Sequence, residues 1–215
     1  MMPTIKTKNG DYHFEPVHLY HGRKKIDKKV ALENLFDTAD MLEKRGIQYG
    51  LIYGTLLGAF RDGDFIEWDE DVDLFVLDED RQNFLGALFE FKEKNLQVVR
   101  YAGDFLSLMR GDDYIDLYFF RKSLFGKRAC GSDVLDEKYF TDFQTIDFRG
   151  RNIPCLGRTE EFLIQVYGHD WRTPLPNKPA DARGKVAKLK GVLRPYIPKI
   201  LLGHLRVFKS IFRVR

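Results

Sequence analysis

The architecture of this chain is set by two neighbouring stretches, Gly54-Thr55-Leu56-Leu57-Gly58-Ala59-Phe60-Arg61 and Asp71-Val72-Asp73-Leu74-Phe75-Val76-Leu77. The apolar run before the first stretch predicts a strand over residues 47–53, which turns at Gly54-Thr55 into a short helix over residues 56–60. The second stretch alternates in polarity and predicts a strand whose successive side chains point to opposite faces of a sheet. Asp71 and Asp73 are therefore expected on one face.

Working outward, the remaining pattern alternates between helical and extended periodicity. Helical spacing predicts helices over residues 27–45, 79–94 and 159–168, and short apolar runs predict strands over 96–101, 105–109, 114–120, 145–148 and 152–155. The last two strands are expected to form a hairpin. The order of elements predicts an α+β (mixed α/β) fold, in which a mixed β-sheet is flanked by helices.

Length and composition favour one catalytic domain. The chain has 215 residues, of which 44% are hydrophobic, and this is enough to form one core of ordinary size. We expect an N-terminal extension (1–26), a catalytic domain (27–175) and a linker with a basic tail (176–215). No apolar run is long enough for a membrane span or a signal peptide, so we expect a cytoplasmic protein. The two cysteines, Cys130 and Cys155, do not have the spacing of a zinc site.

A third acidic residue interrupts the apolar run of residues 114–120. Asp116 lies in Tyr-Ile-Asp-Leu-Tyr-Phe-Phe, where a carboxylate without a partner would be costly to bury. Together, Asp71, Asp73 and Asp116 predict a compact anionic cluster. Such carboxylates raise one another's pKa unless a divalent cation compensates their charge, and oxygen ligands favour Mg²⁺ or Mn²⁺. Because magnesium often binds substrate phosphates as well, the cluster predicts a phosphate-containing substrate.

Three residues upstream complete the candidate site. Gly54 permits a close approach of the backbone, and Thr55 offers a hydroxyl at the predicted helix N-terminus, where exposed amides favour phosphate oxygens. Arg61 is a candidate for neutralising a further phosphate oxygen. We therefore predict that Gly54, Thr55 and Arg61 bind the phosphates of the donor.

These motifs, taken in order, resemble the signature of the LicD/fukutin family of phosphotransferases. The matching segments span roughly residues 30–175 and comprise 54–61, Phe65-Ile66, Trp68-Asp69, Asp71-Val72-Asp73, Ile115-Asp116, Tyr167-Gly168, Asp170-Trp171 and Pro174. The resemblance implies a nucleotidyltransferase-type fold and transfer of a phospho-alcohol, of phosphocholine or phospho-polyol type, from a CDP-activated donor to a sugar hydroxyl. The acceptor would be a cell-surface glycan or its lipid-linked precursor.

By position, the resemblance implies that Asp71 and Asp73 bind metal ions. Asp116 would complete the site, either as a ligand or as the base for the acceptor hydroxyl. Two alternatives from other classes stay open: a nucleotidyltransferase that attaches the nucleotide itself to a protein or small molecule, and a catalytically silent membrane adaptor.

The charge distribution separates the tail from the rest. Residues 1–181 carry 25 basic and 32 acidic groups, a balance of −7, whereas residues 182–215 carry 10 basic groups and no acid. Within a predicted amphipathic helix, Lys199, Arg206, Lys209 and Arg213 gather on one face. Residues 183–215 are therefore expected either to bind the anionic inner surface of a membrane, making the protein peripheral, or to pack on the domain or another subunit. Nucleic acid is an unlikely partner, because the acidic core offers no second basic surface.

Overall fold

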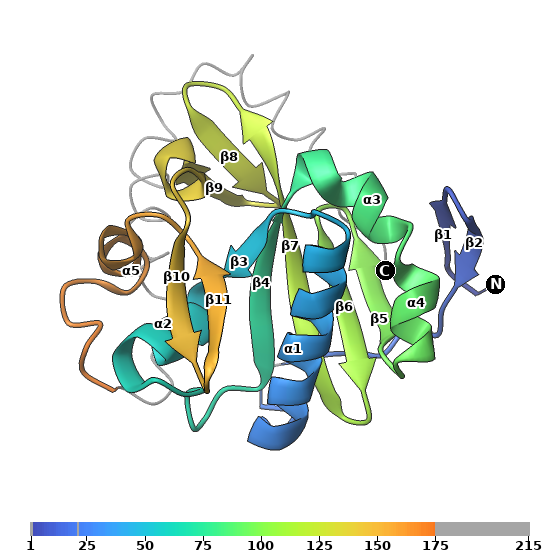
Figure 1. Ribbon diagram of the computed structural model, residues 1–215, viewed down its shortest axis with the longest axis horizontal. Helices are drawn as coiled ribbons and strands as arrows, with labels where there is room; N and C mark the ends of the chain where they lie inside the picture. The colour runs from blue at the N-terminus through green and yellow to red at the C-terminus, as the bar shows by residue number, and fades with distance from the viewer. Residues whose placement is uncertain (1, 21, 175–215) are drawn as a thin grey trace, which may run out of the picture. The chain divides into compact units, whose positions relative to one another are not determined.

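The computed structural model describes residues 2–20 and 22–174, and residues up to Arg172 form one compact unit (Figure 1). The predicted linker and basic tail, residues 176–215, lie outside the described residues. The helices and strands follow in the order β1 (Thr4–Thr7), β2 (Gly10–His13), α1 (Lys28–Lys44), β3 (Tyr49–Leu51), α2 (Tyr53–Asp62), β4 (Asp71–Leu77), α3 (Arg81–Leu85), α4 (Leu88–Glu93), β5 (Gln97–Ala102), β6 (Phe105–Arg110), β7 (Asp113–Ser123), β8 (Lys127–Cys130), β9 (Asp133–Asp136), β10 (Gln144–Phe148), β11 (Arg151–Cys155) and α5 (Thr159–Tyr167). Short 3₁₀ turns, Asp78–Asp80 and Glu137–Phe140, precede α3 and follow β9.

The central sheet is mixed, as predicted. Its main path runs β10-β11-β3-β4-β7-β6-β5, and β8 and β9 extend from β7. The pairs β4–β7 and β11–β3 are parallel, whereas β3–β4, β5–β6, β6–β7 and β10–β11 are antiparallel. The predicted fold class, a mixed sheet flanked by helices, is therefore confirmed for the described residues.

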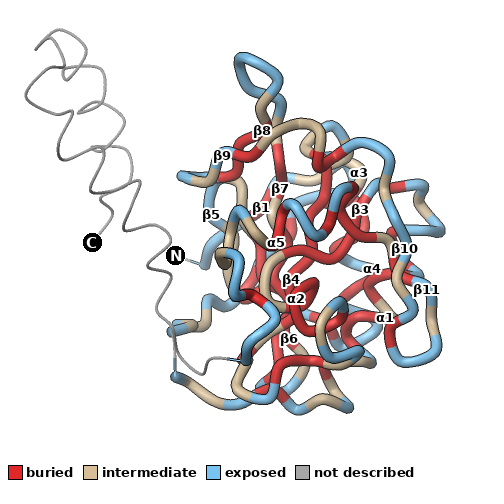
Figure 2. Tube along the Cα trace, turned by 90° about the vertical axis from the view of Figure 1, so that its left-hand side faces the viewer, coloured by how far each residue is buried: buried red, intermediate tan, exposed pale blue. Residues whose placement is uncertain are grey.

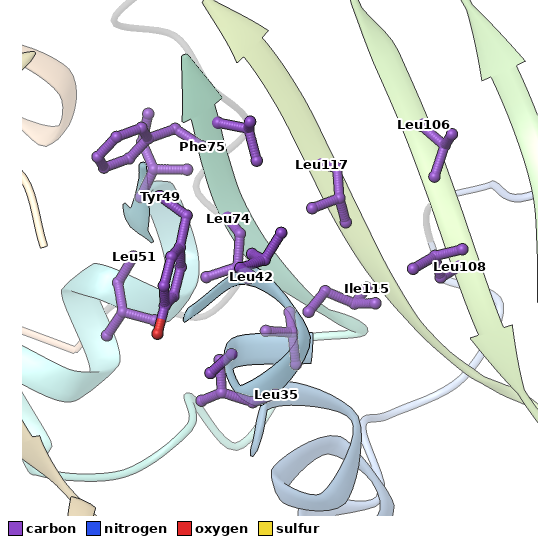
Figure 3. Packing of buried hydrophobic residues seen from close by; sticks show 14 of the residues in the cluster. Leu35, Leu42, Tyr49, Leu51, Leu74, Phe75, Leu106, Leu108, Ile115 and Leu117 are labelled. Atoms are coloured by element: carbon purple, nitrogen blue, oxygen red, sulfur yellow. The ribbon is translucent and has the colours of Figure 1, made fainter. Parts of the chain in front are cut away.

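Helix α1 covers one face of the strands β4, β7 and β6 (Figure 1). Asp27 caps this helix, because its side chain accepts hydrogen bonds from the backbone amides of Lys29 and Val30. Figure 3 shows Leu35 and Leu42 of α1 beside the leucine and isoleucine side chains of these strands. The strand residues on this face are fully buried and include Leu74, Leu106, Leu108, Ile115 and Leu117. This packing makes the centre of the sheet the most buried part of the molecule (Figure 2).

The opposite face changes character along the strands. Toward the ends of β4 and β7 it is apolar, where Phe75 and Phe120 pack on Phe140 with ring centroids 5.3 and 4.7 Å apart. Toward the beginning of the same strands it carries Asp73 and Asp116. The apolar part fixes the strands side by side, and the acidic part is left to face a pocket.

Several elements differ in extent from those predicted, and β3 covers only Tyr49–Leu51 of the strand predicted over residues 47–53. Helix α2 begins at Tyr53, so that Gly54 and Thr55 already lie in its first turn. The single helix predicted over residues 79–94 is broken between α3 and α4, because the N-terminal hairpin docks there: the Asn9 side-chain amide donates to the carbonyl of Gly86 at 2.7 Å. The hairpin β10–β11 is confirmed, and its two-residue turn is Arg149-Gly150, both with positive φ.

Four strands, which form two hairpins, were not anticipated from the sequence. The hairpin β1–β2 turns just before Gly10, and β8 and β9 form a second hairpin that continues from the unusually long β7. Over residues 2–20 and 22–174, every helix is too short or too polar to cross a bilayer.

Candidate active site

A polar row crosses four adjacent strands on the face opposite α1. The register pairs Asp73 of β4 with Asp116 of β7, Asp116 with Ser107 of β6, and Ser107 with Arg100 of β5. Residues paired across neighbouring strands point to the same face of a sheet. The sheet therefore brings together two acids that are 43 positions apart in the sequence, as the sequence predicts, and adds a hydroxyl and a guanidinium that it did not predict.

Asp116 is held by its two neighbours in the row. Ser107 donates its hydroxyl proton to Asp116 Oδ1 at 2.6 Å, and Arg100 Nη2 donates to both carboxylate oxygens at 3.2 and 3.0 Å. Arg100 Nε in turn donates to the Ser107 oxygen at 2.9 Å. With Asp116 only 3% exposed, these charge-assisted bonds fix the orientation of its carboxylate.

Asp73 is held by the first turn of α2. The Gly54 amide donates to Asp73 Oδ2 at 3.0 Å, the Tyr118 hydroxyl donates to Oδ1 at 3.1 Å, and the Asp73 amide donates to the Thr55 hydroxyl at 2.8 Å. A Cβ atom at position 54 would lie 2.5 Å from Asp69 Oδ2 and 3.2 Å from Asp73 Oδ2. A side chain at this position would therefore have to displace the Asp69 carboxylate.

Asp116 and Arg100 of the polar row line a pocket of about 300 Å³, whereas Asp73 and Ser107 are not part of its lining. Its walls combine acidic, aromatic and apolar side chains with one arginine: Leu19, Tyr20, Asp69, Glu70, Asp71, Arg100, Phe105, Tyr114, Asp116 and Tyr118. The acids come from β4, β7 and the loop before β4, whereas Leu19 and Tyr20 come from the N-terminal segment. This segment is tied to the edge of the sheet by a hydrogen bond from the Val17 amide to the Val99 carbonyl, at 3.0 Å.

The acids perturb one another strongly. Burial, followed by the charges of Asp73 and Asp116, raises the pKa of Asp71 well above its usual range. Burial and the charges of Asp69 and Asp116 do the same to the pKa of Asp73, against the opposite effect of the hydrogen bonds from Tyr118 and Gly54. Burial also raises the pKa of Asp116, although Arg100 and Ser107 act in the other direction. Ionisation of this cluster is therefore opposed until positive charge enters it.

The donor set of the cluster fits a hard divalent cation. Its atoms are carboxylate oxygens, and its electrostatic need is for positive charge; both are properties of Mg²⁺ and Mn²⁺ sites. Within the described part of the chain, no three His, Cys, Asp or Glu side chains already have the geometry of a metal site. The reason is visible in the contacts: Asp116 is bonded to Arg100 and Ser107, and Asp73 to Gly54 and Tyr118.

The three residues predicted to bind donor phosphates are placed differently from one another. Gly54 and Thr55 lie beside Asp73 and are hydrogen-bonded to it. Arg61 lies in the last turn of α2 and pairs with Asp62, with its side chain 8% exposed. Its charge still reaches the region of the acids: burial and Asp73 raise the pKa of Tyr167, and Arg61 acts against them.

Several residues of the site escaped sequence reasoning. Asp69 was noted only within the Trp68-Asp69 motif and was given no role in the site. It lies two positions before Asp71, and this period of two was the signal that could have placed it there. Arg100 and Ser107 carried no such signal, because a bulge between Val98 and Arg100 shifts the register of β5 against β6.

Sequence comparison gives the family of this domain. The family model described as "LicD/FKTN/FKRP, nucleotidyltransferase domain" matches residues 46–155, just over half of the chain. Together, the mixed sheet and the acidic pocket define a nucleotidyltransferase-type domain, and the chain belongs to the LicD/FKTN/FKRP family. The resemblance noted from the motifs is confirmed.

Relatives from bacteria and animals are similar over different lengths. An uncharacterized protein of Rickettsia typhi is 31% identical over 149 residues, which are 68% of this chain and 45% of that protein. The ribitol 5-phosphate transferase FKRP of Mus musculus is 44% identical over 72 residues, 32% of this chain and 14% of FKRP. The lipopolysaccharide cholinephosphotransferase LicD of Haemophilus influenzae is 30% identical over 87 residues, 40% of this chain and 32% of LicD. This chain therefore spans less than half the length of these relatives.

Structural comparison agrees on the fold. The antibiotic-resistance factor ANT(2'')-Ia superposes with a TM-score of 0.53 and 13% sequence identity, over 83% of this chain and 99% of that one. At this level of identity the likeness concerns the fold alone.

Proposed function

We propose that this protein is a metal-dependent phosphotransferase, which moves a phospho-alcohol from a CDP-activated donor to a sugar hydroxyl of a glycan or its lipid-linked precursor. The observation that carries the proposal is the pairing of Asp73 with Asp116 across parallel strands, where Asp116 and the neighbouring Asp71 line one pocket. Family membership supports the proposal, since the named relatives are a ribitol 5-phosphate transferase and a cholinephosphotransferase.

Asp71, Asp73 and Asp116 are the residues that would hold Mg²⁺ or Mn²⁺. Such ions neutralise the charge of phosphate oxygens and stabilise the charge that develops during phosphoryl transfer. Asp116 serves as a further ligand or accepts the proton of the acceptor hydroxyl. Its bonds to Arg100 and Ser107 suit either role, because they orient the carboxylate and favour its charged form.

The first turn of α2 contributes position rather than charge. Gly54 and Thr55 hold Asp73, and the N-terminus of α2 places its amides beside the acids. In the proposed function, these two residues and Arg61 lie along the path of the donor phosphates. Phosphoryl transfer depends mainly on positioning and charge neutralisation, so a rigid support for one carboxylate affects the rate directly.

The decisive experiment follows the leaving group. Purified full-length protein is incubated with CDP-choline or CDP-ribitol, with Mg²⁺, Mn²⁺ or EDTA, and with or without glycan acceptors, and CMP and pyrophosphate are quantified. We expect metal-dependent CMP release and transfer of the labelled headgroup to the acceptor. Asp40 lies on α1 and its side chain is 59% exposed, so Asp40→Asn provides a matched control for Asp73→Asn.

The two alternatives give different products. Release of pyrophosphate from CTP or ATP, with the nucleotide attached to the acceptor, would replace the proposal by nucleotidyl transfer. Absence of both products with every donor, from protein that is folded by circular dichroism, would contradict catalysis and favour the adaptor hypothesis. Membrane association through residues 183–215 is a separate part of the proposal, and is tested by flotation of full-length and truncated protein with anionic vesicles.

A further inference from the structure

One basic side chain lines the acidic pocket within the described residues. Arg100 shares the wall with Asp69, Glu70, Asp71 and Asp116. Its side chain is 33% exposed, whereas that of Asp116, its partner, is 4% exposed. The pair is therefore asymmetric: the carboxylate is enclosed by protein, and the partly exposed arginine side chain lines the pocket.

The hydrogen bonds of Arg100 use one edge of its guanidinium. Nε donates to Ser107, and Nη2 donates to both oxygens of Asp116. The Phe105 ring lies against the guanidinium plane, with 4.3 Å from Cζ to the ring centroid. An arginine held by its edge and by its plane loses little further freedom when its remaining N–H groups bind a ligand, and guanidinium geometry suits phosphate oxygens.

Arg61 and Arg110, by contrast, do not line this pocket. Arg61 is largely buried and engaged by Asp62, and Arg110 points to the α1 face, where it pairs with Asp37. Arg110 is a matched comparison for Arg100, since both are strand arginines bonded to an aspartate, but on opposite faces of the sheet.

From this arrangement, and resting on the proposed function, we infer that Arg100 binds a phosphate oxygen of the nucleoside diphosphate donor. Ser107 is a positioning residue for this contact: its oxygen, fully buried, accepts from Arg100 and donates to Asp116. The donor diphosphate brings negative charge into a wall of carboxylates, and Arg100 is the positive group that the described part of the chain supplies there. The contact makes Arg100 a determinant of donor affinity.

The test is calorimetric titration with CDP in the presence of Mg²⁺, alongside titration with Mn²⁺ alone. For Arg100→Gln we expect a Kd for CDP about ten- to a hundredfold higher, as befits the loss of a charge-assisted hydrogen bond. Arg100→Lys retains the charge without the planar fork, so its Kd should fall between those of Arg100→Gln and the wild type. Arg110→Gln is the control and should bind CDP as the wild type does.

Binding of Mn²⁺ alone separates phosphate contact from indirect support of Asp116. If Arg100 contacts the donor, Arg100→Gln loses CDP affinity while its Mn²⁺ affinity stays within about threefold of the wild type. Unchanged CDP affinity in Arg100→Gln overturns the inference. So does a parallel loss of Mn²⁺ and CDP affinity that Ser107→Ala reproduces, because Arg100 would then act only through Asp116.

Failure of this inference and failure of the proposed function are distinguishable. A wild-type protein that binds CDP through Arg100 but transfers no headgroup contradicts the proposed function and leaves the phosphate site standing. If the wild type releases CMP and Arg100→Gln has the same KM for the donor, only the phosphate site is contradicted. A wild-type protein that binds no CDP overturns the inference outright.

Discussion

The two faces of β4 and β7 are built from alternating residues of the same strands, yet they have opposite energetic effects. Leu74, Ile115 and Leu117 are fully buried under α1, and burial of such a side chain contributes about 1.5 to 3 kcal/mol. Asp73 and Asp116, which alternate with them, lie close together with raised pKa values. The apolar face stabilises the sheet, and the sheet in turn holds together carboxylates that repel one another.

This contrast explains how the acids stay together in spite of their mutual repulsion. A strand fixed by its other face has no freedom to move its carboxylates apart, so the repulsion persists in the folded state as raised pKa values. We infer that the acidic face lowers the stability of the fold in the interest of function, and that packing on the α1 face compensates for this loss. Three substitutions break or sharpen the comparison.

Asp73→Asn has the largest expected effect. Loss of a carboxylate that neutralises and orients bound cations should lower kcat/KM for metal-dependent CMP release on the order of 10³-fold, while the melting temperature does not fall. Steady-state kinetics on Asp73→Asn and on the exposed control Asp40→Asn measures this. An Asp73→Asn protein with wild-type kcat/KM would remove Asp73 from the site.

Leu35→Ala weakens the packing of α1 on the apolar face of the sheet. Leu35 is fully buried on α1 against the sheet, and its truncation should lower the free energy of unfolding by about 2 to 5 kcal/mol. The remaining folded molecules should keep a nearly normal KM, because the acidic face is untouched. Urea denaturation measures the free energy of unfolding. Steady-state kinetics at low temperature measures the KM. A large change of KM without a change of stability would contradict this separation of roles.

Asp71→Asn should give the smallest effect, and it should raise the free energy of unfolding where Leu35→Ala lowers it. Because the folded-state pKa of Asp71 is raised above its ordinary value of 3.8, folding is favoured when Asp71 is protonated, and this stability is lost as pH rises above that value. In metal-free buffer at pH 7, Asp71→Asn should therefore be more stable than the wild type, by about 1 kcal/mol, or about 2 to 4 °C.

The pH dependence supplies the internal control for Asp71→Asn. The advantage of the variant should shrink as pH falls towards 4, because the raised pKa lets the folded wild type take up the Asp71 proton above that pH. Mg²⁺ should raise the melting temperature of the wild type more than that of the variant. Thermal scans from pH 3.5 to 8 test both statements. A variant that is less stable than the wild type across this range would show that Asp71 is not repelled by its neighbours.

Much of this arrangement is predictable from local pattern. The period of two in Asp71-Val72-Asp73 places both acids on one face, and the apolar run around Asp116 predicts the partner strand. The cap at Asp27 and the Arg149-Gly150 turn are likewise local features, and the elements that they bound are observed.

Non-local contacts account for what the pattern missed. The bulge that brings Arg100 opposite Ser107 depends on the pairing of β5 with β6, and the break between α3 and α4 depends on a hydrogen bond from Asn9, 77 positions away. The Asn9-Gly10 pair was a usable turn signal for the N-terminal hairpin, whereas nothing local indicates where that hairpin docks.

The measurement that tests the central claim most directly is the binding of Mn²⁺ to the wild type and to Asp73→Asn. It is measured by calorimetry and by the loss of the electron paramagnetic resonance signal of free Mn²⁺. If Asp71, Asp73 and Asp116 hold the metal, the wild type should bind Mn²⁺ saturably. This binding should be lost or greatly weakened in Asp73→Asn and retained in Asp40→Asn. Failure of the wild type to bind Mn²⁺, or equal binding by the wild type and Asp73→Asn, would contradict the claim that these carboxylates form a metal site.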